Sequence, residues 1–251
     1  MRRTVLLALS ISLMPFCTGN ASGPILVDDF NLTNGLSISN FGFQNGISFS
    51  AYDAPVDALG GSRQAAVRIT NNPVNAFDSV SASIGNGVLT YSSSSQGHGV
   101  LWLFYNNSGA GFSLDLTSNL AAGDSFLITF ASPLSTALTL VMSFHSTDFG
   151  GADVSQNIPA GASNFSVPLS AFMPNGTFHQ SSITSLTAQF QTTTDGATYQ
   201  IDRMAFVPEP PATVLFIASL GVLFLCRRTS IWLTTHRILL SVNRQTSRRT
   251  Q

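Results

Sequence analysis

In residues 138–144, LTLVMSF, the largest apolar side chains stand at every second position. Residues 186–191, LTAQFQ, repeat this pattern. Alternation with a period of two is typical of a β-strand that lays one face on a core and turns the other face outward. Both stretches therefore predict strands, and they decide how the rest of the chain is interpreted.

The remainder of the central region fits the same interpretation. Residues 100–105, VLWLFY, are apolar without a break and predict a strand covered on both faces. Turn dipeptides such as Asn86-Gly87 and Asp195-Gly196 separate short apolar runs. The chain has no lysine and a single glutamate, Glu209, which disfavours a helix-rich fold. Residues 22–206 are thus predicted to form one all-β domain, a two-layer antiparallel sandwich.

Charge is scarce and unevenly placed in this chain of 251 residues, of which 9% are charged. Residues 22–207 hold eleven aspartates and three arginines, while the other arginines lie near the two ends. An acidic central region excludes nucleic acid as a partner, because binding to phosphates needs a basic surface. Both cysteines, Cys17 and Cys226, lie in apolar end segments, so no disulfide is expected in the domain.

Residues 1–21 have the organisation of a secretory signal peptide. Arg2 and Arg3 precede an apolar stretch, and the small residues of 19–21, GNA, suit a cleavage site. The apolar stretch is shorter than the ~20 residues of a membrane span, which disfavours an N-terminal anchor. We therefore expect the domain to be exported.

A second apolar stretch, residues 212–226, predicts a short transmembrane helix. Arg227 and Arg228 follow it directly, and positive residues mark the cytoplasmic end of a span. This orientation places residues 22–207 on the far side of the membrane.

Pro208, Glu209 and Pro210 stand immediately before this helix. The order of a Pro-Glu-Pro motif, a helix and the basic pair Arg227 and Arg228 resembles the PEP-CTERM sorting signal, here over residues 207–228. The resemblance implies an exosortase-type processing enzyme as partner in a Gram-negative bacterium that makes exopolysaccharide. It also implies export across the inner membrane, transient anchoring by the helix, and a final place at the cell surface or outside the cell. A chance proline-rich linker is the alternative.

Residues 229–251 extend beyond the basic pair, whereas chains with such signals usually stop there. This basic tail fits an amphipathic segment on the inner membrane face. An accidental extension past a lost stop codon explains it equally well.

A second resemblance covers most of residues 25–206. ILVDDF at 25–30 and YQIDRMAF at 199–206 look like the first and last strands of galactose-binding-like jelly rolls. This resemblance implies a jelly-roll-like sandwich and a structural calcium where those strands meet. Asp28 or Asp29 together with Asp202 would supply carboxylate oxygens, which calcium prefers. The alternative is that these aspartates are solvated residues at strand ends.

No pattern points to catalysis. The sequence lacks the Gly-x-Ser-x-Gly nucleophile elbow, and His98, His145 and His179 have no neighbours at metal-ligand spacing. Glycoside hydrolysis needs two facing carboxylates, and the sequence does not pair any of its aspartates. We expect a protein that is not an enzyme.

Sugar binding would use exposed aromatic rings as flat platforms. The candidates are Trp102, Tyr52, Tyr91, Tyr105 and Tyr199. Trp102 lies in the uninterrupted apolar stretch, which favours a core position, and the phenylalanines are likewise expected in the core.

The leading hypothesis is an exported, non-enzymatic cell-surface or matrix protein associated with exopolysaccharide or biofilm. The first alternative is a carbohydrate-binding module with a defined glycan site. The second, less favoured, is a secreted enzyme that acts on polysaccharides.

If Glu209 is read by a processing enzyme, the Glu209→Gln variant should be exported and folded but should stay in the inner membrane at full length. Fractionation and mass measurement of both proteins, in a host with the exosortase, check this. Equal mass and equal membrane retention of wild type and variant would reduce the motif to a stiff linker.

Overall fold

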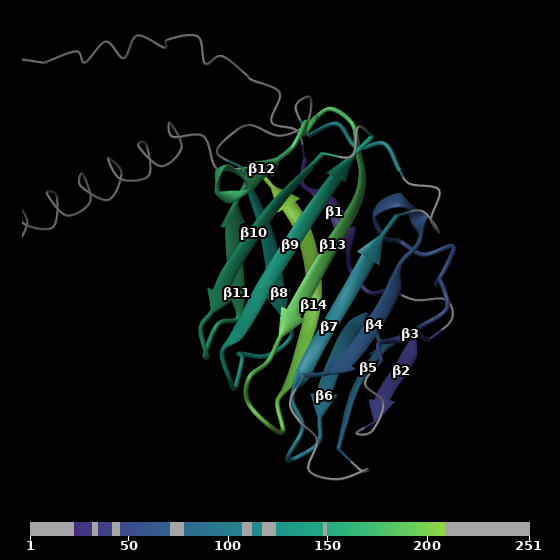
Figure 1. The fold of residues 1–251 in the computed structure, drawn as a ribbon, viewed down its shortest axis with the longest axis vertical. Helices are drawn as coiled ribbons and strands as arrows, with labels where there is room; N and C mark the ends of the chain where they lie inside the picture. Colours follow the sequence, from purple (N-terminus) through teal and green to yellow (C-terminus); the bar gives the residue numbers. More distant parts are fainter. Residues whose placement is uncertain are drawn as a thin grey trace, which may run out of the picture. The chain divides into compact units, whose positions relative to one another are not determined.

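The computed structural model describes residues 23–31, 35–41, 46–70, 78–106, 112–116, 124–147 and 150–208. These residues form two seven-stranded antiparallel sheets that pack face to face (Figure 1). The buried apolar side chains of both sheets form one core cluster between the layers. The predicted antiparallel sandwich is confirmed.

Strands that are distant in sequence lie side by side in both sheets. Sheet A has the order β11 (Asn164–Pro168), β8 (Ser125–Phe130), β14 (Thr198–Val207), β6 (Val88–Ser93), β5 (Ser79–Gly85) and β2 (Ser37–Phe41), and β1 (Ile25–Asp28) also pairs with β14. Sheet B has the order β12 (Met173–Asn175), β10 (Gly151–Ile158), β9 (Leu138–Ser146), β13 (Ile183–Gln191), β7 (Gly99–Tyr105), β4 (Gln64–Ile69) and β3 (Ser48–Phe49). Two 3₁₀ segments are η1 (Leu59–Gly61) and η3 (Leu169–Ala171).

The two alternating stretches lie in β9 and β13, which are adjacent central strands of sheet B. In β9 the four large apolar residues are buried, and the residues between them face outward. The hairpin between β5 and β6 turns at Asn86 and Gly87, which have φ values of 53° and 75°. Positive φ at both central residues is what a type I′ turn requires, one of the two turns that two-residue hairpin loops favour, so this predicted turn is confirmed.

The prediction that residues 100–105 are covered on both faces was wrong. Leu101, Leu103 and Tyr105 are fully buried in the core, but Trp102 and Phe104 are only half-buried. The reason is the pleat: these two side chains point away from the core, onto the outer face of sheet B.

The predicted signal peptide at residues 1–21 lies outside the described residues, as do Glu209, Pro210, Arg227, Arg228 and the tail at 229–251. Pro208 is the last described residue, and the compact unit that contains the sandwich ends there. Within the described ranges, no helix is long and apolar enough to cross a membrane.

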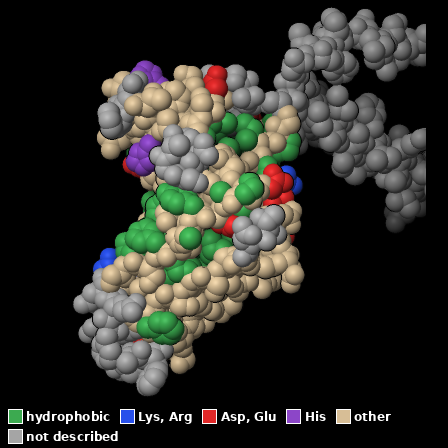
Figure 2. Space-filling view, turned by 90° about the vertical axis from the view of Figure 1, so that its right-hand side faces the viewer, with side chains coloured by type: hydrophobic (Ala, Val, Ile, Leu, Met, Phe, Trp, Pro, Cys, Tyr) green, Lys and Arg blue, Asp and Glu red, His purple; other side chains and the backbone are tan. Residues whose placement is uncertain are grey.

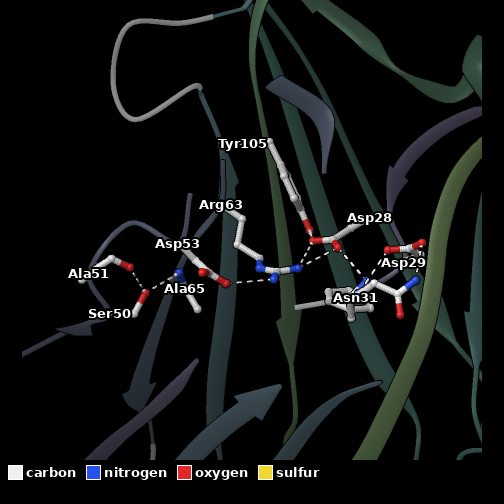
Figure 3. A network of polar contacts seen from close by, with 10 residues as sticks. Asp28, Asp29, Asn31, Ser50, Ala51, Asp53, Arg63, Ala65 and Tyr105 are labelled. Atoms are coloured by element: carbon white, nitrogen blue, oxygen red, sulfur yellow. Dashed lines mark hydrogen bonds and ion pairs between the residues drawn. The ribbon is translucent and has the colours of Figure 1, made fainter. Parts of the chain in front are cut away.

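A buried ion pair connects the two sheets. Arg63, directly before β4 of sheet B, is fully buried and donates from Nη1 to both carboxylate oxygens of Asp28 in β1, at 2.7 and 2.8 Å. Its Nη2 donates to Asp53 at 2.9 Å. The hydroxyl of Tyr105, at the end of β7, donates to Asp28 at 2.9 Å (Figure 3).

Because the ion pair and Tyr105 are buried, the protonation state of each group depends on its neighbours. Burial raises the pKa of Asp28 above its ordinary value, and the guanidinium of Arg63 opposes that shift. Burial also raises the pKa of Tyr105 well above its ordinary value, so its hydroxyl keeps the proton that it donates. The Phe30 ring lies 5.6 Å from the Arg63 guanidinium carbon and helps to exclude water.

Replacing Arg63 by Met should lower the free energy of unfolding by about 3–5 kcal/mol, because two buried carboxylates lose their counter-charge. Urea denaturation measures this loss. The matched control is Arg68→Met in β4, since Arg68 is exposed and its loss should cost about 0.5 kcal/mol or less. Equal effects of the two changes would contradict the assigned role of the ion pair.

Candidate functional site

The outer face of sheet B carries side chains in rows that cross the strands. In the central row, Phe49 of β3 is opposite Ala66 of β4, and Ala66 is opposite Trp102 of β7. The row continues through β13, β9 and β10 with Gln189, Val141 and Ser155. Residues directly opposite one another in antiparallel strands point to the same side of the sheet, so these six side chains share this face.

Aromatic rings occupy one half of this face. The rings of Phe49 and Phe104 come within 6.3 Å of each other, centroid to centroid, although β4 lies between their strands. Ala66 of β4 is fully buried although its side chain points outward. We call Phe49, Phe104 and Trp102 the aromatic platform.

Two exposed residues near Phe49 extend the platform, and a hydrogen bond fixes the ring of Trp102. Ile47 and Tyr52 are 42% and 40% exposed, and they lie two residues before and three residues after Phe49. The Tyr52 hydroxyl accepts a hydrogen bond from Asn106, two residues beyond Phe104. Trp102 donates from its indole nitrogen to Gln189 Oε1 at 2.9 Å, which fixes the indole and leaves its ring face as the contact surface.

The other half of the face is polar and almost uncharged. Most outward residues of β13, β9 and β10 are polar, and Val141 and His145 of β9 share the face; the polar ones with hydroxyl or carboxamide groups are Thr187, Gln189, Gln191, Thr139, Ser143, Ser155 and Asn157. Among the described outward residues of the sheet B strands, only Asp153 in β10 carries a carboxylate, and Arg68 carries the guanidinium at the opposite side. Hydroxyl and carboxamide groups thus lie beside the aromatic platform.

Figure 2 looks at the side of the sandwich on which β2 and β3 lie. Hydrophobic side chains gather there, where the outline of the molecule is hollowed. Phe49, with 56% of its surface exposed, is among the most exposed large apolar residues described. Exposed apolar side chains that lie close together, as Phe49 does with the other rings of the platform, indicate a contact surface for a ligand or partner.

The predicted platform residues separate into two groups. Trp102 points to the outer face and Tyr52 is 40% exposed with its hydroxyl bound to Asn106, whereas Tyr91, Tyr105 and Tyr199 are buried. Tyr91 and Tyr199 stack in the core at 4.7 Å between ring centroids. The prediction of a core position for Trp102 was wrong, because the pleat of β7 points its side chain outward.

The sequence interpretation missed Phe49 and Phe104, which it assigned to the core. Phe104 stands two residues after Trp102 and so shares its face of the strand, but Trp102 was itself predicted to lie in the core, so this spacing did not reveal the platform. Phe49 lies in a strand of two residues, too short to show a period.

The first and last strands do meet, since β1 pairs with β14. Both oxygens of Asp28 are bound by Arg63, while Asp29 binds Asn31, and Asp202 is exposed on β14. Within the described residues, no three His, Cys, Asp or Glu side chains form a group that could hold a metal. Calcium at these aspartates stays a prediction, and the ion pair with Arg63 does not favour it.

Comparisons with known proteins identify only distant structural similarity. No protein-family model matches the sequence, and no curated protein is similar to it. Similar solved structures include a family 11 carbohydrate-binding module from Clostridium thermocellum in complex with a β-1,3-1,4-mixed-linked tetrasaccharide, 13% identical with a TM-score of 0.36. That match covers 75% of this chain and 97% of the module.

Two other similar structures are a second carbohydrate-binding module and part of a longer protein. A family 30 carbohydrate-binding module of the cellulase Cel9D-Cel44B of Clostridium thermocellum is 15% identical, with a TM-score of 0.35, over 75% of this chain and 94% of that one. PfGH50B is 11% identical with a TM-score of 0.39 over 57% of this chain, which spans 22% of that protein. At these TM-scores the similarities carry no conclusion about what this chain binds.

Proposed function

We propose that the outer face of sheet B binds a carbohydrate and that the protein acts as a binding module. The observation that carries the proposal is the aromatic platform, Phe49, Phe104 and Trp102, lying in the same rows as hydroxyl and carboxamide side chains.

Sugars present two kinds of surface, and the face offers a partner for each. The C–H side of a pyranose ring is apolar and packs on the face of an aromatic ring, which buries apolar area from both. Sugar hydroxyls donate and accept hydrogen bonds, as do the carboxamides of Gln189 and Gln191. Because the indole N–H of Trp102 is bound to Gln189 Oε1, the amino group of Gln189 stays available to a ligand.

A binding role without catalysis fits the charges on this face. Glycoside hydrolysis requires a pair of carboxyl groups about 5–10 Å apart. Of the described outward residues on the sheet B strands, Asp153 alone has a carboxylate, and it lies in β10, separated from the platform strand β7 by β9 and β13.

The cellular setting is a separate proposal that rests on the sequence. The signal-peptide pattern and the PEP-CTERM-like segment at residues 207–228 support export and delivery to the cell surface. A glycan-binding sandwich delivered there would hold exopolysaccharide or another surface polysaccharide.

Wild-type protein should be retarded in affinity electrophoresis by at least one polysaccharide of a panel of β-glucan, xylan, galactomannan, agarose and alginate. Phe49→Ala and Trp102→Ala should each weaken that binding roughly tenfold or more, because buried aromatic contacts dominate binding energy. Urea denaturation of each variant checks that the sandwich remains folded.

The control is Phe41→Ala. Phe41 is 53% exposed, close to the 56% of Phe49, but it lies on β2 of sheet A. Its replacement should leave binding unchanged. Loss of binding in Phe41→Ala with retention in Phe49→Ala and Trp102→Ala would place the site elsewhere, and retardation by no polysaccharide would refute the function.

A further inference from the structure

We propose that a pocket at one end of sheet B is a second subsite for the same ligand, and that this ligand is a neutral oligosaccharide several units long. This inference rests on the proposed function. It adds the class of glycan and a second point, distant from the aromatic platform, at which the glycan chain is bound.

The pocket has a volume of about 290 Å³ and lies where β9 begins and β10 and β13 end. Its lining residues are Ala137, Leu138, Thr139, Asn157, Ile158, Pro159, Gln191 and Thr193. The volume is at the lower end of the range for small-molecule sites, which suits a single sugar unit of a longer chain.

All of these side chains are uncharged, and the carboxamides of Asn157 and Gln191 have hydrogen-bonding groups that a ligand can use. Thr139 donates to Asn157 Oδ1 at 3.1 Å, so the Asn157 amino group is not used in that bond. The Gln191 carboxamide forms no side-chain hydrogen bond with another described residue. Amides and hydroxyls can both donate to and accept from sugar hydroxyls.

The lining of the pocket carries no charge, and this determines which class of glycan the pocket favours. A carboxylate or sulfate held in such a pocket would lose hydration without gaining a counter-charge, which is costly. A neutral sugar has hydroxyls that amides and threonines satisfy. The pocket therefore favours neutral glycans over acidic ones.

The pocket is continuous with the face that carries the platform. Gln191 is opposite Val100 of β7 on one side and Thr139 of β9 on the other, and Thr139 is opposite Asn157. Gln191 also stands two residues after Gln189, the partner of Trp102, at a distance of about 7 Å along the strand. From β3 to β10 the face spans five strand intervals, about 24 Å, which exceeds the length of one sugar unit.

The test uses the full chain and the neutral polysaccharide that binds most tightly in the panel above, cut into oligosaccharides of two to six units. Calorimetry should show affinity rising with length. The double variant Gln191→Ala, Asn157→Ala should weaken binding of the hexasaccharide roughly tenfold and leave binding of the disaccharide within about twofold.

The matched control is Gln200→Ala, because Gln200 is a half-buried glutamine in β14 of sheet A. It should bind every oligosaccharide as the wild type does. Phe49→Ala should weaken binding of short and long oligosaccharides alike, which reports on the platform and hence on the proposed function.

Two results would overturn the inference while leaving the proposed function intact. One is a double variant that binds the hexasaccharide as tightly as Gln200→Ala does. The other is tighter binding of acidic oligogalacturonates than of the neutral series, with an affinity that falls as salt rises. If Phe49→Ala has no effect at any length, the proposed function itself fails.

Discussion

The ion pair between Arg63 and Asp28 is the interaction on which the sandwich and its outer face both depend. It joins β1 of sheet A to the start of β4 in sheet B, and neither side chain has access to water. Two hydrogen-bond partners of the pair lie next to residues of the candidate site in the chain. Tyr105, which donates to Asp28, directly follows Phe104, and Asp53, which accepts from Arg63, directly follows Tyr52. The buried hydrogen bonds around Arg63 and Asp28 thereby fix the segments whose outward side chains form the aromatic platform.

This coupling explains how exposed rings can be held in a fixed arrangement. A phenylalanine at the surface gains little from burial, and a strand of two residues such as β3 has few ladder hydrogen bonds. The segment that contains β3 is held on its C-terminal side, where Asp53 and Arg63 exchange backbone hydrogen bonds at 2.9 and 3.1 Å. On the far side of the platform, the bond from Trp102 to Gln189 fixes the indole. A rigid aromatic surface binds more tightly than a mobile one, because less conformational entropy is lost on contact.

The sequence predicts the fold well and the site only in part. Alternation in residues 138–144 and 186–191 depends on local pleating, so it is visible without tertiary structure. The partner of Asp28 is not visible, because Arg63 lies 35 residues away and meets it only when the two sheets pack. The predicted calcium site had the correct strands but did not anticipate that a guanidinium would bind both oxygens of Asp28. Phe49 and Phe104 were assigned to the core because composition does not tell which face of a sheet lies open.

Binding of a neutral glycan across the outer face of sheet B is the proposal that unites the aromatic platform and the pocket. Its most direct test is an NMR titration of the isotopically labelled protein with the bound oligosaccharide. The largest shifts should fall on the indole N–H of Trp102 and the carboxamides of Gln189, Gln191 and Asn157, while the carboxamide of Gln200 in sheet A should not shift. Shifts confined to sheet A would contradict it.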